Sequence, residues 1–222
     1  MIVELMGASG AGKSTLVAAV LKTREGARWV DAARLAGPRP ETCPPWHDSF
    51  LARKKDWLRQ QGHADSVAAE QLDIAAAQLQ VECLAEADPR RHILSAEGIM
   101  QMFSGELLED SQAGDRMAQR LLAARHAVLL ICDPEAVVRN VLKRRQTGPA
   151  RPLMDHLSAD EIHANAVAFE MHLRNLARET NRRGGTCMML HAEDGFESCV
   201  EQLEDYLQIA RTVAEARPPQ PV

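Results

Sequence analysis

Short, almost wholly apolar runs alternate along the chain with longer stretches in which apolar residues recur every three or four positions. The short runs are typical of buried strands, and the longer stretches are typical of amphipathic helices. This pattern predicts five strands, at residues 2–6, 27–31, 92–96, 127–132 and 186–191, of which the second has the weakest signal. Strands that alternate with helices form a parallel sheet covered on both faces. The sequence therefore predicts an α/β fold in three layers, with a mostly parallel five-stranded sheet.

Start and stop signals mark several of the predicted helices. Asp133 is an N-cap residue followed by Pro134 at the first helical position, after the fourth strand. Ser158 and Glu161 have capping-box spacing and open a long helix with an apolar face. That helix is expected to stop at Gly184, just before the last strand.

Residues 32–90 separate the second and third predicted strands and form an insertion. Within it, residues 48–87 predict two helices that are broken near Gly62. Because an insertion at this place is not needed to build the sheet, we expect it to form the site of a second substrate.

The sequence GASGAGKS, residues 7–14, fits the phosphate-binding motif G-x-x-x-x-G-K-[ST]. Its glycines let the backbone N–H groups turn toward the phosphates, and the following helix presents its positive end. Lys13 is expected to reach the β- and γ-phosphates, and Ser14 to give an oxygen to Mg²⁺. Sequence reasoning thus predicts ATP and Mg²⁺ as cofactors. The predicted binding residues are Gly7, Ala8, Ser9, Gly10, Ala11, Gly12, Lys13, Ser14 and Thr15.

This motif and its position after the first strand resemble the P-loop kinase group of P-loop NTPases, which includes thymidylate kinase, the deoxynucleoside kinases and other small-molecule phosphotransferases. The resemblance in layout covers about residues 1–210, and only the phosphate loop is specific at the residue level. It implies a single domain at residues 1–212 with strand order 2-3-1-4-5. It also implies an acceptor-site insertion at about 32–90 and a lid at about 139–157, with a flexible tail at 213–222.

Two carboxylates follow predicted strands at the edge where a parallel sheet binds its ligands. Glu97 follows the third strand and is expected to hold Mg²⁺ or to orient the acceptor, although it also fits a solvated loop. P-loop kinases often carry an aspartate one position earlier, where this chain has Ala96. Asp31 ends the second strand and resembles the general base of several small-molecule kinases. The alternative for Asp31 is an N-cap, and both interpretations stay open.

A cluster of basic residues lies between the fourth strand and the capping box: Arg139, Lys143, Arg144, Arg145 and Arg151. P-loop kinases carry an arginine-bearing lid here, whose guanidinium groups stabilise the transferring phosphoryl group. By that resemblance, Arg139, Arg145 and Arg151 are candidate catalytic residues together with Lys13, Asp31 and Glu97. The alternative is a solvated basic helix end.

Composition narrows the possible partners. The 222-residue chain has 26 lysines and arginines against 31 acids, so its net charge of −5 argues against nucleic-acid binding. No apolar run approaches the ~20 residues that span a bilayer, and a cytoplasmic protein without membrane contact is expected. The five cysteines form no metal-binding pattern and are expected to be buried thiols. Whether the chain forms a homodimer stays open.

The sequence therefore favours an ATP-dependent kinase that moves the γ-phosphate to a hydroxyl or phosphate of a small-molecule acceptor, such as a nucleoside or nucleotide. A guanine-specific N-K-x-D segment is absent from the sequence, which argues against a regulatory GTPase. A P-loop regulatory ATPase, or a nucleotide-binding module without an acceptor, is the alternative. No motif in the sequence identifies the acceptor.

Overall fold

A five-stranded sheet forms the centre of the computed structural model, which describes residues 1–35, 46–60, 65–88, 90–147 and 156–216. Its strands are β1 (Ile2–Met6), β2 (Val30–Asp31), β3 (Ile93–Ser95), β4 (His126–Ile131) and β5 (Thr186–His191). The order is β2-β3-β1-β4-β5, and every neighbouring pair is parallel. The predicted fold class and strand order are thus confirmed.

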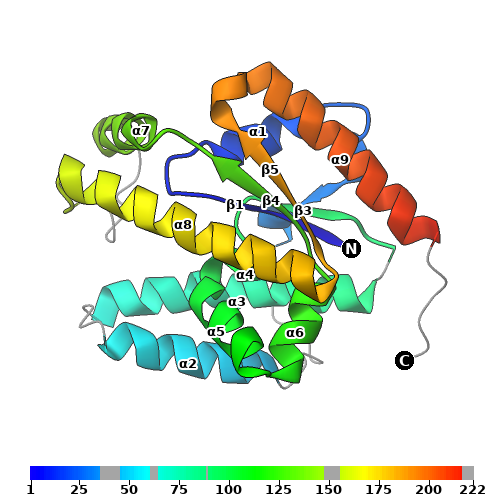
Figure 1. Cartoon of the computed structure of the whole chain (residues 1–222), viewed down its shortest axis with the longest axis horizontal. Helices are drawn as coiled ribbons and strands as arrows, with labels where there is room; N and C mark the ends of the chain where they lie inside the picture. Colours follow the sequence, from blue (N-terminus) through cyan, green and yellow to red (C-terminus); the bar gives the residue numbers. More distant parts are fainter. Residues whose placement is uncertain (36–45, 61–64, 89, 148–155, 217–222) are drawn as a thin grey trace.

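Helices cover both faces of the sheet, as Figure 1 shows. On one face lie α1 (Lys13–Val20) and α9 (Phe196–Ala216). On the other face α8 (Ala159–Arg183) lies against β4 and β5. Beyond and beside α8 are the remaining helices of that face: α2 (Trp46–Gln60), α3 (Asp65–Ala87), α4 (Ile99–Met102), α5 (Ser104–Ala113) and α6 (Arg116–Ala123). Helix α7 (Pro134–Thr147) follows β4 and lies beside α8.

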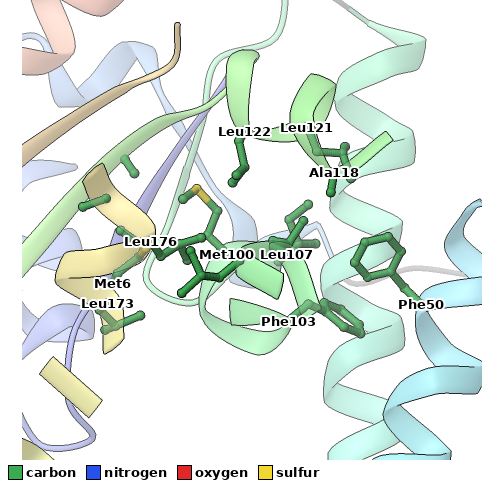
Figure 2. Packing of buried hydrophobic residues seen from close by; sticks show 14 of the residues in the cluster. Met6, Phe50, Met100, Phe103, Leu107, Ala118, Leu121, Leu122, Leu173 and Leu176 are labelled. Atoms are coloured by element: carbon green, nitrogen blue, oxygen red, sulfur yellow. The ribbon is translucent and has the colours of Figure 1, made fainter. Parts of the chain in front are cut away.

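The two largest apolar cores that result from this arrangement lie on opposite faces of the sheet. Because successive side chains of a strand point to opposite faces, Val3 and Leu5 of β1 lie in the core under α1 and α9. Met6 lies in the other core, which Figure 2 shows extending from Leu173 of α8 to Phe50 of α2. The α2 helix of the insertion is therefore packed into the main domain.

The helix signals agree closely with the structure. Helix α7 begins at Pro134, and Ser158 and Glu161 form the capping box that opens α8. Helix α8 ends at Gly184, whose φ of 99° gives the left-handed cap that glycine favours. Helix α9 continues past residue 212 to Ala216, into the segment expected as a tail.

The second strand is much shorter than predicted. Residues 27 and 28, expected to open it, belong instead to the 3₁₀ turn Gly26–Arg28. Trp29 N–H donates to the carbonyl oxygen of Gly26 and closes that turn. A side chain at Gly26 would collide with the backbone of Val20, so the turn packs tightly against the end of α1. Only Val30 and Asp31 reach β3.

The structure tests the expectation that the cysteines are buried thiols. Cys132, Cys187 and Cys199 are free thiols, and burial raises the pKa of Cys187 to about 12. Cys83 is disulfide-bonded, so the expectation that all cysteines are thiols was wrong. Within the described part of the chain, no helix has both the length and the apolar character needed to cross a bilayer.

Candidate active site

The phosphate-binding motif forms a loop between β1 and α1, at the carboxyl edge of the sheet. Gly7 has a φ of 153°, and a side chain there would lie 2.7 Å from the carbonyl oxygen of Leu130 in β4. Gly10 has a φ of 92° and lets Val141 of α7 approach, because a Cβ at Gly10 would lie 3.0 Å from the valine methyl group. The loop is therefore enclosed by β4 and α7, and its glycines are required for that fit.

Lys13 lies at the start of α1 and is 5% exposed. Its Nζ donates hydrogen bonds to the carbonyl oxygens of Gly7 at 2.7 Å and of Ala8 at 3.2 Å. The ammonium group is thus held across the loop. Ser14 and Thr15 follow it on the exposed side of the first turn, where Ser14 can offer its hydroxyl oxygen.

Helix α7 brings polar side chains to the same loop. Asn140 Nδ2 donates to the carbonyl oxygen of Gly10 at 2.9 Å, and Arg144 Nη2 donates to Ser9 Oγ at 3.3 Å. Arg144 was named in the basic cluster but was not among the predicted catalytic residues. The sequence could have indicated Arg144 through its spacing from the buried residues Val137 and Val141, because that spacing puts all three on one helix face.

Two of the three arginines predicted as catalytic, Arg139 and Arg145, contact other parts of the molecule. Arg139 is exposed and pairs with Glu135 on the same helix at 3.9 Å. Arg145 donates to the carbonyl oxygen of Leu157 at 2.8 Å and so joins α7 to the residue just before the α8 cap. Arg151 lies outside the described residues, as do residues 148–155 of the expected lid. Of the arginines described here, Arg144 is the one with a hydrogen bond to the phosphate loop.

Asp31 and Glu97 stand at the carboxyl ends of β2 and β3. Asp31 Oδ1 accepts a hydrogen bond from Ala33 N at 3.0 Å and caps the 3₁₀ turn Ala32–Arg34. Glu97 is half-buried, and no described residue forms a hydrogen bond or ion pair with its carboxylate. The hydroxyl of Ser95 donates to the backbone carbonyl of Glu97 and fixes the chain there.

The side chains that could bind a metal ion beside the phosphate loop offer oxygen atoms. A hydroxyl at Ser14 and a carboxylate at Glu97 are ligands of the type that Mg²⁺ prefers, and Mg²⁺ commonly needs one or two protein ligands beside phosphate and water. In the described part of the chain, no group of three or more His, Cys, Asp or Glu side chains is placed to hold a metal on its own. These residues therefore fit a metal that arrives with a triphosphate.

A cavity of about 590 Å³ opens beside the phosphate loop. Ala8 and Ser9 of the loop form one part of its wall, and Gln101 of α4 forms another. Its other lining residues come from α2, α7 and α8: Trp57, Val137, Ile162, Asn165, Ala166, Ala168, Phe169 and His172. The rings of Phe169 and His172 are stacked, with 6.3 Å between centroids and 17° between planes.

The wall of this cavity comes from several segments of the chain. The acceptor site was expected in the insertion at 32–90, and among its described residues Trp57 is the one that lines the cavity. Lys54 lies over the Trp57 ring at 4.5 Å and donates to the carbonyl oxygen of Met102, which fixes this wall. Most of the wall belongs to α8, which the sequence presented only as an amphipathic helix. Periodicity identified its buried face and gave no sign of the cavity.

No protein-family model matches the chain, and no curated protein matches it in sequence. Among solved structures, deoxyadenosine kinase from M. mycoides with the products dCMP and a flexible dCDP bound has a TM-score of 0.51 at 13% identity. The same enzyme with dATP bound has a TM-score of 0.49 at 14% identity. Each comparison covers 94% of this chain and 100% of the other. The first likeness shows that the chain has the fold of a P-loop kinase.

Proposed function

We propose that the chain is an ATP-dependent phosphotransferase that moves the γ-phosphate to a hydroxyl of a small acceptor. The observation that carries this proposal is the shared wall: Ala8 and Ser9 belong both to the phosphate loop and to the 590 Å³ cavity. A molecule in that cavity would lie against the residues that hold the phosphates. Phosphoryl transfer depends mainly on such positioning and on electrostatic stabilisation.

The cavity favours an uncharged, flat acceptor, and a nucleoside is the class that we propose. Trp57, Phe169 and His172 offer aromatic surfaces for stacking, while Gln101 and Asn165 offer amide donors and acceptors. No Lys, Arg, Asp or Glu is among the described lining residues. A phosphorylated acceptor would need cationic partners, so the composition favours a nucleoside over a nucleotide. The fold likeness to a deoxyadenosine kinase is consistent with this choice.

In the proposed reaction, the acceptor hydroxyl oxygen forms a bond to the γ-phosphorus while the bond to the β–γ bridging oxygen breaks. Asp31 accepts the hydroxyl proton, and ADP leaves with the bridging oxygen. Lys13 and Arg144 supply positive charge to the phosphate oxygens, because both already contact the loop. Arg139, Arg145 and Arg151 remain proposed contributors. Ser14 and Glu97 would hold Mg²⁺, which supplies charge neutralisation on the phosphates when it is bound.

The proposal is tested by ADP formation from ATP and Mg²⁺, with and without a panel of nucleosides, nucleotides and sugars. We expect a nucleoside to stimulate ADP formation and to yield its monophosphate in equal amount. Lys13→Ala should lower that rate at least ~100-fold, because the charge on the transferring group loses its partner. Lys22→Ala is the matched control, since Lys22 is an exposed lysine after α1.

Two other outcomes would favour the alternatives. ADP formation that no acceptor in the panel changes would support a regulatory ATPase and overturn the kinase proposal. Tight ADP binding without any turnover would support a nucleotide-binding module.

A further inference from the structure

Glu4 is a carboxylate in the middle of the central strand, and its side chain is fully buried. It lies on the face of β1 that also carries Met6, inside an apolar core. Burying a carboxylate is costly unless its oxygens are hydrogen-bonded. Both oxygens are: Oε2 accepts from Met100 N at 3.1 Å, and Oε1 accepts from Gln101 N at 2.8 Å.

Gly98 makes this contact sterically feasible. A Cβ at Gly98 would lie 2.4 Å from the Glu4 carboxyl group, so a side chain there would displace it. The chain that follows β3 thus passes directly over the carboxylate and turns into α4.

Gln101 continues the connection to the phosphate loop. Its Oε1 accepts a hydrogen bond from Gly7 N, the first residue of the loop, at 3.0 Å. Because that oxygen is engaged, the amide NH₂ group is the part of Gln101 that can donate to a molecule in the adjacent cavity. Glu4 therefore holds the backbone of a residue whose side chain contacts the loop and lines the cavity.

We propose that Glu4 is a positioning residue that, through Gln101, fixes the start of the phosphate loop in its nucleotide-binding conformation. The same contact orients the amide that Gln101 presents to the acceptor. The inference rests on the nucleotide-binding half of the proposed function. Two backbone N–H groups require two accepting oxygens, which an ionised carboxylate supplies and a carboxamide does not.

The charge state of Glu4 gives this role a recognisable signature. Burial raises the pKa of Glu4 to about 7, while Arg125 and the two backbone N–H groups act in the opposite direction and Glu82 adds to the rise. A protonated Glu4 turns one accepting oxygen into a donor and releases one of its two N–H partners. Nucleotide binding should therefore weaken as the pH falls from 8 to 6.

The decisive variant is Glu4→Gln in the 222-residue chain. Its dissociation constant for ADP in the presence of Mg²⁺ is measured by titration calorimetry. At pH 8 the dissociation constant should rise about tenfold, the equivalent of one charge-assisted hydrogen bond. At pH 6 the variant and the natural chain should bind almost equally, because Glu4 is then protonated. The titration of ADP itself is common to both proteins and cancels in the ratio.

Glu204→Gln is the matched control. Glu204 also accepts a backbone hydrogen bond, from Glu25 N at 3.0 Å, but it lies on α9 on the opposite face of the sheet. Its variant should bind ADP like the natural chain at both pH values.

Gln101→Leu tests the connection itself, because it removes the acceptor for Gly7 N. In that background Glu4→Gln should have no further effect on ADP binding, as expected for residues that act in series. Should Glu4→Gln not fold, Gln101→Leu carries the test alone: its ADP affinity should fall about tenfold at pH 8 and match the natural chain at pH 6.

The outcomes separate this inference from the proposed function. A natural chain that does not bind ADP and Mg²⁺ would overturn the proposed function. A natural chain that binds ADP, together with a Glu4→Gln variant whose affinity ratio is the same at pH 6 and pH 8, would overturn only the positioning role.

Discussion

Asp31 combines a structural contact with the position expected of a general base. Its carboxylate caps the turn that follows β2 by accepting from Ala33 N, and β2 ends at the same edge of the sheet as the phosphate loop. The two roles use different properties of the side chain. The cap needs one accepting oxygen, whereas proton abstraction needs a basic carboxylate.

Asp31→Asn separates the two roles, because an asparagine keeps the accepting oxygen and loses the basicity. We expect kcat to fall about 10²- to 10⁴-fold while ADP affinity and thermal stability stay unchanged. Steady-state kinetics with the stimulating acceptor, ADP titration and thermal unfolding measure the three quantities. Asp31→Ala, which also removes the cap, should lower stability as well. An unchanged kcat in Asp31→Asn would show that Asp31 acts as a cap and not as the general base.

Among single residues, the sequence predicted the backbone geometry of those whose conformation is encoded locally. The phosphate-loop residues are consecutive, and their spacing specifies their backbone geometry. Glu4 and Gln101 were missed because their contacts join residues more than 90 positions apart. Within the basic cluster, the choice among arginines depended on which face α7 turns toward the loop. Val137 and Val141 determine that face, and it carries Arg144.

At the scale of elements, α8 links local sequence signals to the cavity. Ser158 Oγ accepts from Glu161 N at 3.3 Å, and Glu161 Oε2 accepts from Ser158 N at 2.7 Å. This capping box sets where α8 begins. The first turns of α8 then carry Ile162 and Asn165 into the cavity wall.

Ser158→Ala should destabilise the protein by about 1 kcal/mol, because one N–H group of the first turn loses its acceptor. For a chain of this size, that corresponds to a fall in Tm of about 2–4 °C. Thermal unfolding followed by circular dichroism measures it. Ser158→Asp keeps an accepting oxygen and should retain most of the stability. Equal losses in both variants would contradict the capping role.

Helices and strands were predictable wherever the start and stop signals agreed with the periodicity of apolar residues. Caps at Ser158 and Gly184 defined α8, and apolar runs defined β1, β4 and β5. The second strand is shorter than predicted because Gly26 packs against the end of α1, six residues earlier, and the chain turns before Val30. The apolar residues of the predicted strand do not themselves indicate that contact.

At the scale of the whole molecule, the cavity is assembled from segments that are remote in sequence. The loop contributes Ala8 and Ser9, the insertion contributes Trp57, and α8 contributes Phe169 and His172. Such a surface exists only after α2, α7 and α8 have docked on the sheet. The sequence could therefore predict the phosphate-loop motif, but not the set of residues that lines this cavity.

A buried ion pair ties the insertion to this assembly. Arg125, just before β4, donates from both terminal nitrogens to the carboxylate of Glu82 on α3, each at 2.7 Å. Both side chains are only 7% exposed. Arg125 also lowers the pKa of Glu4, the carboxylate for which we propose a role in fixing the phosphate loop.

Arg125→Met should destabilise the folded chain by about 3–5 kcal/mol, because Glu82 is left as an uncompensated buried charge. The double variant Arg125→Met with Glu82→Leu replaces both charges by apolar groups and should recover most of that loss. Urea unfolding of the three proteins at pH 7.5 measures the differences. A double variant as unstable as Arg125→Met would contradict this account, since the loss would then come from packing of the arginine stem. Because the pair joins α3 to the sheet beside Glu4, its removal should also weaken ADP binding. The double variant should therefore recover more of the free energy of unfolding than of the ADP affinity.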